Sequence, residues 1–113
     1  LLKNKHTSKP LEVQLADKVE ITSDLAKAIE LNPKELTYFS ELAVVNIRVG
    51  RNEEAIKVLK DALEIDSKYA EAYRLIGVAQ LQLKQNKEAC ASFAKAKELG
   101  DPNVDALIEK HCK

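Results

Sequence analysis

Residues 39–65, FSELAVVNIRVGRNEEAIKVLKDALEI, decide the fold, because their pattern returns 34 residues later in residues 73–99, YRLIGVAQLQLKQNKEACASFAKAKEL. In each stretch apolar residues recur at helical spacing, a polar break follows, and a second apolar stripe begins. Small residues align with small residues, as Ala43 does with Gly77, and bulky residues align with bulky ones. Each period therefore predicts two helices, and the chain contains an internal repeat.

The ends of these helices are marked by particular residue types. Gly50 stands where the C-terminus of a helix favours a left-handed residue. Asn52 is a good N-cap for the next helix, and Glu53 and Glu54 fall in its first turn, where the helix dipole favours acids. Asn86 takes the same place in the second period. The sequence thus predicts that one helix ends before Gly50 and that Asn52 caps another helix, whose first residue is Glu53.

The length of the unit and its small and bulky positions resemble the tetratricopeptide (TPR) repeat family. Units 36–69 and 70–103 match the family at Phe39, Leu42, Ala43, Ala55, Leu59 and Ala62, and at Tyr73, Ile76, Gly77, Ala89, Phe93 and Ala96. The departures are Asn46 and Gln80 for an aromatic residue, Ser67 for proline, and Pro102, which falls one residue late. The resemblance covers residues 17–113. It implies an all-α fold, a right-handed superhelical array of antiparallel helix pairs (an α-solenoid) with about six helices.

The two ends of the array differ. Residues 17–35 resemble the second half of a preceding unit, and residues 1–16 are expected to form a basic tail with a possible short helix from Pro10. One long helix from Pro10 to Leu31 is the alternative. At the other end we expect a capping helix over residues 102–113, because a terminal repeat needs an amphipathic cover for its exposed face.

Composition and charge exclude several classes of protein. Lys plus Arg number 18 and Asp plus Glu number 18, and this balance argues against nucleic acid as the main partner. The longest apolar run, Leu75–Leu83, is too short to span a bilayer, so direct membrane insertion is not expected. No secretory signal is visible, although one could precede Leu1. A cytoplasmic location is favoured, and the compartment stays open.

The sequence carries little that suggests catalysis. It lacks the glycine-rich phosphate loops, the zinc-protease helix motif and the serine-nucleophile motif. Its two histidines, His6 and His111, fall in the predicted end segments, and no metal or cofactor site is expected. Cys90 and Cys112 are read as free, packed thiols. A bridge would need their Cα atoms within about 7 Å of one another, which a sequence does not reveal. We therefore expect no enzyme.

The family resemblance implies a concave groove lined by the first helix of each unit, which holds a peptide or a partner helix. The corresponding residues are Thr37, Ser40, Val44, Ile47, Arg48, Glu71, Arg74, Val78, Leu81 and Gln82. The floor is apolar and Arg48 and Arg74 edge it, which suits an apolar or amphipathic ligand with an acidic group. Alternatively, Ile47 and Leu81 pack against the neighbouring unit, and the two arginines are only solvated.

One subtype of the family can be tested residue by residue. Co-chaperones with these repeats hold the C-terminal carboxylate of chaperones that end in EEVD, using a clamp of Lys and Asn side chains. The clamp positions hold Ser40, Val44 and Leu75 here. The two full units therefore do not supply the clamp, although an upstream unit could have contributed to it.

We accordingly expect a non-catalytic protein–protein interaction module, an adaptor or scaffold. The helix over residues 17–31 is expected to have an open apolar side, covered by residues 10–16, by an upstream domain or by a second copy of the chain. The first alternative function is self-assembly, in which this side forms a homodimer. The second alternative is an accessory domain of a larger enzyme or secretion protein.

Overall fold

The computed structural model describes residues 27, 29 and 35–113, and in this part of the chain it contains helices and no strand. The helices are α2 (Leu36–Arg48), α3 (Asn52–Ile65), α4 (Ala70–Gln82), α5 (Asn86–Glu98) and α6 (Asp105–His111). The all-α expectation is confirmed. The basic tail, most of the half unit over residues 17–35 and its expected open face lie outside the described residues, so the sixth helix is not counted here.

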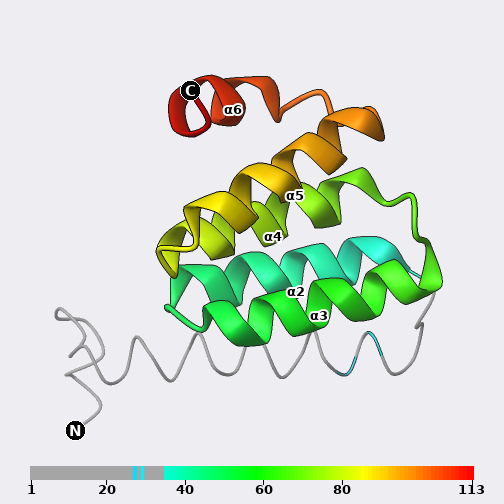
Figure 1. Cartoon of the computed structure of the whole chain (residues 1–113). Coiled ribbons are helices and arrows are strands. Elements are labelled where there is room, and N and C mark those ends of the chain that lie inside the picture. The colour runs from blue at the N-terminus through cyan, green and yellow to red at the C-terminus, as the bar shows by residue number, and fades with distance from the viewer. Residues whose placement is uncertain (1–26, 28, 30–34) are drawn as a thin grey trace, which may run out of the picture.

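In Figure 1 the α2–α3 pair lies below the α4–α5 pair and packs against it. Short turns join α2 to α3 and α4 to α5, and each pair forms an antiparallel hairpin. Helix α3 also packs against α4, and α2 contacts α4 directly. Helix α6 packs against α5 at the far end. This arrangement places α2 and α4, the first helices of the two hairpins, next to each other.

A left-handed residue ends each of three helices. Gly50 follows α2 with φ +84°, and its N–H donates to the carbonyl oxygen of Ile47 over 3.1 Å. Lys84 after α4 and Gly100 after α5 have φ +65° and +94°. A left-handed residue here lets backbone N–H groups satisfy the last carbonyl groups of the helix, and the chain can then reverse. The stop predicted at Gly50 is confirmed.

The helix starts differ by one residue from the prediction. Asn52 and Asn86 are the first residues inside α3 and α5, and Arg51 and Gln85 precede them without a capping side-chain hydrogen bond. The helices start early because the N–H of Ala55 already donates to the carbonyl oxygen of Arg51 over 3.0 Å. The Asn52 side chain is buried instead, and its Oδ1 has no hydrogen-bond partner among the described residues.

The core consists of bulky side chains set against small ones. Leu59 and Phe93 hold the same position in successive units, and both are fully buried. Ala43 lies in the same cluster as Leu59, and Gly77 is the equivalent residue that faces Phe93. A Cβ atom added at Gly77 would lie 2.6 Å from Cδ1 of Phe93. The larger aromatic ring is therefore accommodated by the loss of a methyl group on the facing helix.

The capping helix starts later than predicted. We expected it from Pro102, but α6 begins at Asp105. The preceding residues form turns, because Oδ1 of Asp101 accepts a hydrogen bond from the N–H of Asn103 over 2.7 Å. Val104 is fully buried in the cluster between α5 and α6. The helix still covers the end of α5, as a cap does.

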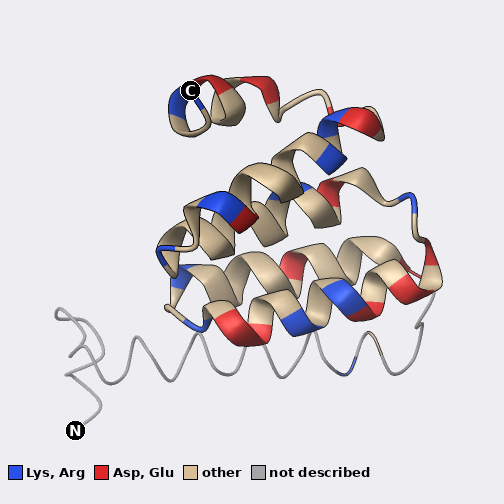
Figure 2. Ribbon diagram, in the orientation of Figure 1, with Lys and Arg blue, Asp and Glu red and all other residues tan. Residues whose placement is uncertain are grey.

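Charged residues recur along α3 (Figure 2), and they lie on its exposed, outer face. Its exposed residues include both signs of charge: Glu53, Glu54, Lys57, Lys60, Asp61 and Glu64. Ile65, 43% exposed at the end of this helix, is the single large exposed hydrophobic side chain in the described part of the chain. No helix there is long and apolar enough to cross a membrane. An apolar ligand therefore has no extended surface to bind on the outer face of α3.

Candidate interaction groove

The ten predicted groove residues lie on two neighbouring helices, five on α2 and five on α4. Their exposure divides them into three groups. The exposed residues are Thr37, Arg48 and Gln82, the half-buried ones are Val44, Glu71, Arg74, Val78 and Leu81, and the buried ones are Ser40 and Ile47. The exposed and half-buried side chains are the ones that a ligand can contact.

The apolar part of this set consists of Val44, Val78 and Leu81. Each of the three is half-buried and packs against a core cluster with part of its surface. Ile47 differs, because it is only 8% exposed and belongs to the cluster itself. It packs inside the fold, as the alternative interpretation of its position held. The remaining apolar strip along α2 and α4 is called the valine–leucine strip below.

A polar network joins α2 to the start of α4. The Ser40 hydroxyl donates to Oε1 of Glu71 over 3.0 Å, and the Tyr69 hydroxyl donates to the same oxygen over 2.8 Å. The hydroxyl groups of Ser40 and Tyr69 also contact each other. Ser40 is thus engaged within the fold, and its hydroxyl is not presented to a ligand.

Tyr69 is a member of this network that the sequence did not identify. It precedes α4 in a segment that reads only as a break between units, and its one signal is an aromatic residue beside a predicted helix start. Burial raises the pKa of the Tyr69 hydroxyl from 10.0 to about 12, and the Glu71 carboxylate acts in the same direction. The hydroxyl therefore stays protonated, and remains a donor, throughout the physiological range.

The two arginines expected at the groove edge have different surroundings. Arg74 donates from Nε to Oδ2 of Asp101 over 3.0 Å and from Nη2 to Oε2 of Glu71 over 3.2 Å. Its side chain is 17% exposed and that of Asp101 is 3% exposed. Arg74 therefore already faces two carboxylates. Arg48 is exposed, and no carboxylate among the described residues pairs with it.

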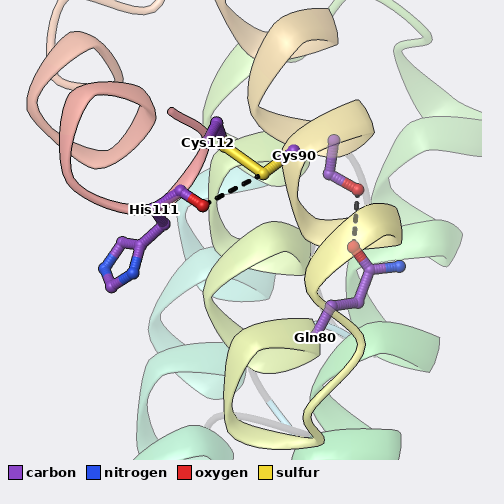
Figure 3. Close-up of a disulfide and its surroundings, with 5 residues drawn as sticks. Gln80, Cys90, His111 and Cys112 are labelled. Atoms are coloured by element: carbon purple, nitrogen blue, oxygen red, sulfur yellow. Dashed lines mark hydrogen bonds between the residues drawn. A yellow bond between two sulfur atoms is a disulfide. The ribbon is translucent and has the colours of Figure 1, made fainter.

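The prediction that the two cysteines are free was wrong. We expected free thiols, but Cys90 in α5 and Cys112 after α6 form a disulfide, with their Cα atoms 5.7 Å apart (Figure 3). The turn after α5 folds α6 back along it, so residues 22 apart in the sequence become neighbours. Nearby, the Ser92 hydroxyl donates to Oε1 of Gln80 over 2.7 Å and joins α5 to α4.

The part of the chain that the structure describes contains no cluster of possible metal ligands. No group of three or more His, Cys, Asp or Glu side chains lies close enough there to hold an ion. His111 is exposed on α6, as its place in the sequence predicted. The chemistry of this surface is therefore that of apolar contacts, one presented guanidinium group and an internally satisfied polar network.

Two family models match the chain. Residues 47–84 match the model described as TPR repeat, and residues 70–99 match the one described as tetratricopeptide repeat. Small glutamine-rich tetratricopeptide repeat-containing protein 2 of Mycosarcoma maydis is 37% identical over 81 residues, which are 72% of this chain and 23% of that protein. The chain thus spans less than a quarter of the length of this curated relative.

Solved structures have the same fold. The Arabidopsis OM64 TPR domain is 26% identical with a TM-score of 0.75, over 87% of this chain and 82% of that one. The first TPR of Spaghetti (RPAP3), solved bound to the HSP90 peptide SRMEEVD, has a TM-score of 0.75 at 19% identity and covers 88% of this chain and 81% of its own. By its repeat, its helix pairs and these matches, the chain belongs to the tetratricopeptide repeat family.

Proposed function

We propose that this chain is a non-catalytic protein–protein interaction module, an adaptor or scaffold, which binds a peptide or a partner helix along α2 and α4. The observation that carries the proposal is the valine–leucine strip beside the exposed Arg48, on the two helices that adjoin each other. The outer face of α3 is charged by comparison. The first TPR of Spaghetti (RPAP3), which has the same fold, is bound to a peptide, and this supports a peptide-binding function.

The proposal includes the arrangement of the array. We take residues 17–35 as a half unit, residues 36–69 and 70–103 as full units, and the segment from residue 102 as the cap, in a right-handed superhelix of about six helices. The hairpins α2–α3 and α4–α5 support the two full units. In such an array the first helices line the concave side, and a ligand there contacts two or more units at once.

The two full units lack the side chains that would bind a C-terminal carboxylate, and this restricts the class of ligand. A clamp for a C-terminal carboxylate would need Lys and Asn side chains where the chain has Ser40, Val44 and Leu75. Ser40 is buried and engaged with Glu71, and Leu75 is 7% exposed in the core. The carboxylate of Glu71 would also repel a ligand carboxylate at this place.

We therefore propose that the ligand is an internal amphipathic segment and not a free C-terminus. Its apolar side chains would cover Val44, Val78 and Leu81, since burial of such contacts supplies most of the affinity of a helix-in-groove complex. An acidic group on the ligand would face Arg48. Arg74 would hold the groove in shape and would not contact the acid, because Glu71 and Asp101 already surround it.

The proposal can be tested with peptides selected from a displayed random library on the immobilised chain. A selected peptide is labelled, and its affinity is measured by fluorescence anisotropy for the wild type, for Arg48→Glu and for Lys57→Glu. Loss of one charge-assisted contact of ~1.5 kcal/mol should weaken binding to Arg48→Glu about tenfold. Lys57→Glu makes the same charge change on the outer face of α3 and should bind like the wild type.

The second arm tests the class of ligand. The peptide SRMEEVD is compared with its C-terminally amidated form at the same concentrations. We expect no difference between the two, because the described groove offers no clamp for the carboxylate. Tighter binding of the free acid would refute the proposed ligand class, and equal loss of library peptides by Arg48→Glu and Lys57→Glu would refute the proposed groove.

A further inference from the structure

The disulfide joins two elements that otherwise share a small contact. Cys90 lies on α5, and Cys112 is the first residue after α6. Both cysteines are half-buried, so the bridge is not enclosed in the core. The bridge joins α5 to the residue after α6, and neither cysteine is one of the ten groove residues (Figure 3).

Apart from the disulfide, few buried contacts hold the capping helix against α5. Helix α6 has seven residues, and none of them is fully buried. Leu107 and Ile108 are half-buried contacts with α5, and Val104 before the helix is its one fully buried anchor. A helix of two turns does not persist in water without tertiary support. The C-terminal half of α6 therefore depends on the link from Cys112 to Cys90.

We propose that Cys90–Cys112 is a redox-modification site, opened by a dithiol, whose state decides whether the C-terminal half of α6 is docked on α5. One thiolate of the dithiol attacks the sulfur of one cysteine and forms a mixed disulfide with it, and the other cysteine leaves as a thiolate that takes up a proton. The second thiol of the dithiol then displaces the cysteine held in the mixed disulfide, which also takes up a proton. Two electrons and two protons pass to the bridge, and the dithiol becomes a disulfide.

The two ends of the capping segment respond differently to this reaction. Asp101, before α6, stays paired with Arg74, and Val104 stays buried, so the start of the segment keeps its place. At the other end the Cys90 sulfur lies 3.6 Å from the carbonyl oxygen of His111. Once reduced, this thiol can donate a hydrogen bond there, but a thiol is a weak donor. Reduction therefore loosens residues 108–112 and leaves α2–α5 as they are.

The experiment uses the full chain in two redox states. After incubation in an oxidised glutathione buffer, intact mass should fall by two hydrogens per chain. Amide hydrogen exchange is then followed by mass spectrometry, without denaturant, before and after addition of dithiothreitol. We expect exchange in residues 108–112 to accelerate about tenfold on reduction, because this segment opens locally, with no change in α3.

The variant with both Cys90→Ser and Cys112→Ser supplies the matched control. Its α6 should exchange like that of the reduced wild type, and addition of dithiothreitol should not alter it. Three results would overturn the proposal. These are a bridge that never forms in the oxidised buffer, a bridge that dithiothreitol opens only in denaturant, and exchange in α6 that is the same in both redox states.

Discussion

Arg74 on α4 donates its Nε–H to Oδ2 of Asp101 over 3.0 Å, so a groove helix holds the loop that leads to the capping helix. The same guanidinium group reaches Glu71, which in turn accepts hydrogen bonds from Ser40 and Tyr69. A continuous polar network therefore runs from α2 through α4 to the turn after α5. Its charges are satisfied internally, which gives the network a role in shaping the surface.

The first prediction concerns the centre of this network. Arg74→Ala should lower the free energy of unfolding by about 3 kcal/mol, because it leaves the buried Asp101 carboxylate without its cation. The measurement is urea unfolding followed by circular dichroism at neutral pH. Lys97→Ala is the control, since Lys97 pairs with Asp105 over 3.1 Å with both side chains mostly exposed. It should cost less than about 1 kcal/mol, and equal losses in the two variants would contradict the prediction.

The second prediction concerns pH. Folded Tyr69 has a pKa raised to about 12, whereas in the unfolded chain it titrates near 10.0. Between pH 10 and 12 the unfolded state therefore binds fewer protons, and the stability that Tyr69 contributes is present below pH 10 and lost as pH rises through this window. Tyr69→Phe should be about 1 kcal/mol less stable than the wild type at pH 8, through the lost hydrogen bonds.

The direction of this pH dependence is tested by comparing the stability of two proteins. Free energies of unfolding are measured for the wild type and Tyr69→Phe from pH 8 to 12, so that the titration of lysines and of the other tyrosines cancels. The gap between the two proteins should close as pH rises above 10. A gap that stays constant over the whole range would show that the Tyr69 hydroxyl titrates normally in the folded chain.

The third prediction concerns the close approach of two helices. Gly77→Ala gains about 1 kcal/mol of helix propensity but places a Cβ against the fully buried Phe93 ring, and overpacking of this kind costs about 1–3 kcal/mol. We expect a net loss of stability. In a Phe93→Leu background the same change should be less costly or favourable, because it recreates the Ala43 and Leu59 pair of the preceding unit.

A double-mutant cycle measures this coupling. Thermal or urea unfolding of the wild type, both single variants and the double variant gives the interaction free energy of residues 77 and 93. If Gly77→Ala had the same effect whether residue 93 is Phe or Leu, the pairing of small and bulky residues would have no energetic meaning here.

Much of the fold could be predicted because repeats carry their information locally. The 34-residue period, the stop at Gly50 and the alternation of Ala43 or Gly77 with Leu59 or Phe93 follow from residue size and backbone preference. These properties are visible in a sequence, since each helix meets only its neighbours along the chain. The helix starts differed by a residue, because the terminal hydrogen bonds and not the asparagine side chains set them.

The candidate site was harder to predict than the fold, because the partners of its side chains are distant in the sequence. Arg74 looked like an exposed partner for an acidic ligand until Asp101, 27 residues later, was found beside it. The disulfide of Cys90 with Cys112 was missed for the same reason, since no spacing rule applies to a single pair of cysteines, one in α5 and one after α6. Tyr69 lay in a loop and had no periodic position from which a role could be inferred.

Amide chemical shifts show residue by residue whether a ligand binds along α2 and α4. The ¹⁵N-labelled chain is titrated with an unlabelled library-selected peptide, and shifts are followed in ¹H–¹⁵N spectra. The largest changes should fall at Val44, Arg48, Val78, Leu81 and Gln82, with the outer face of α3 unaffected. Changes centred on Lys57, Lys60 and Glu64, or on α6 alone, would contradict it.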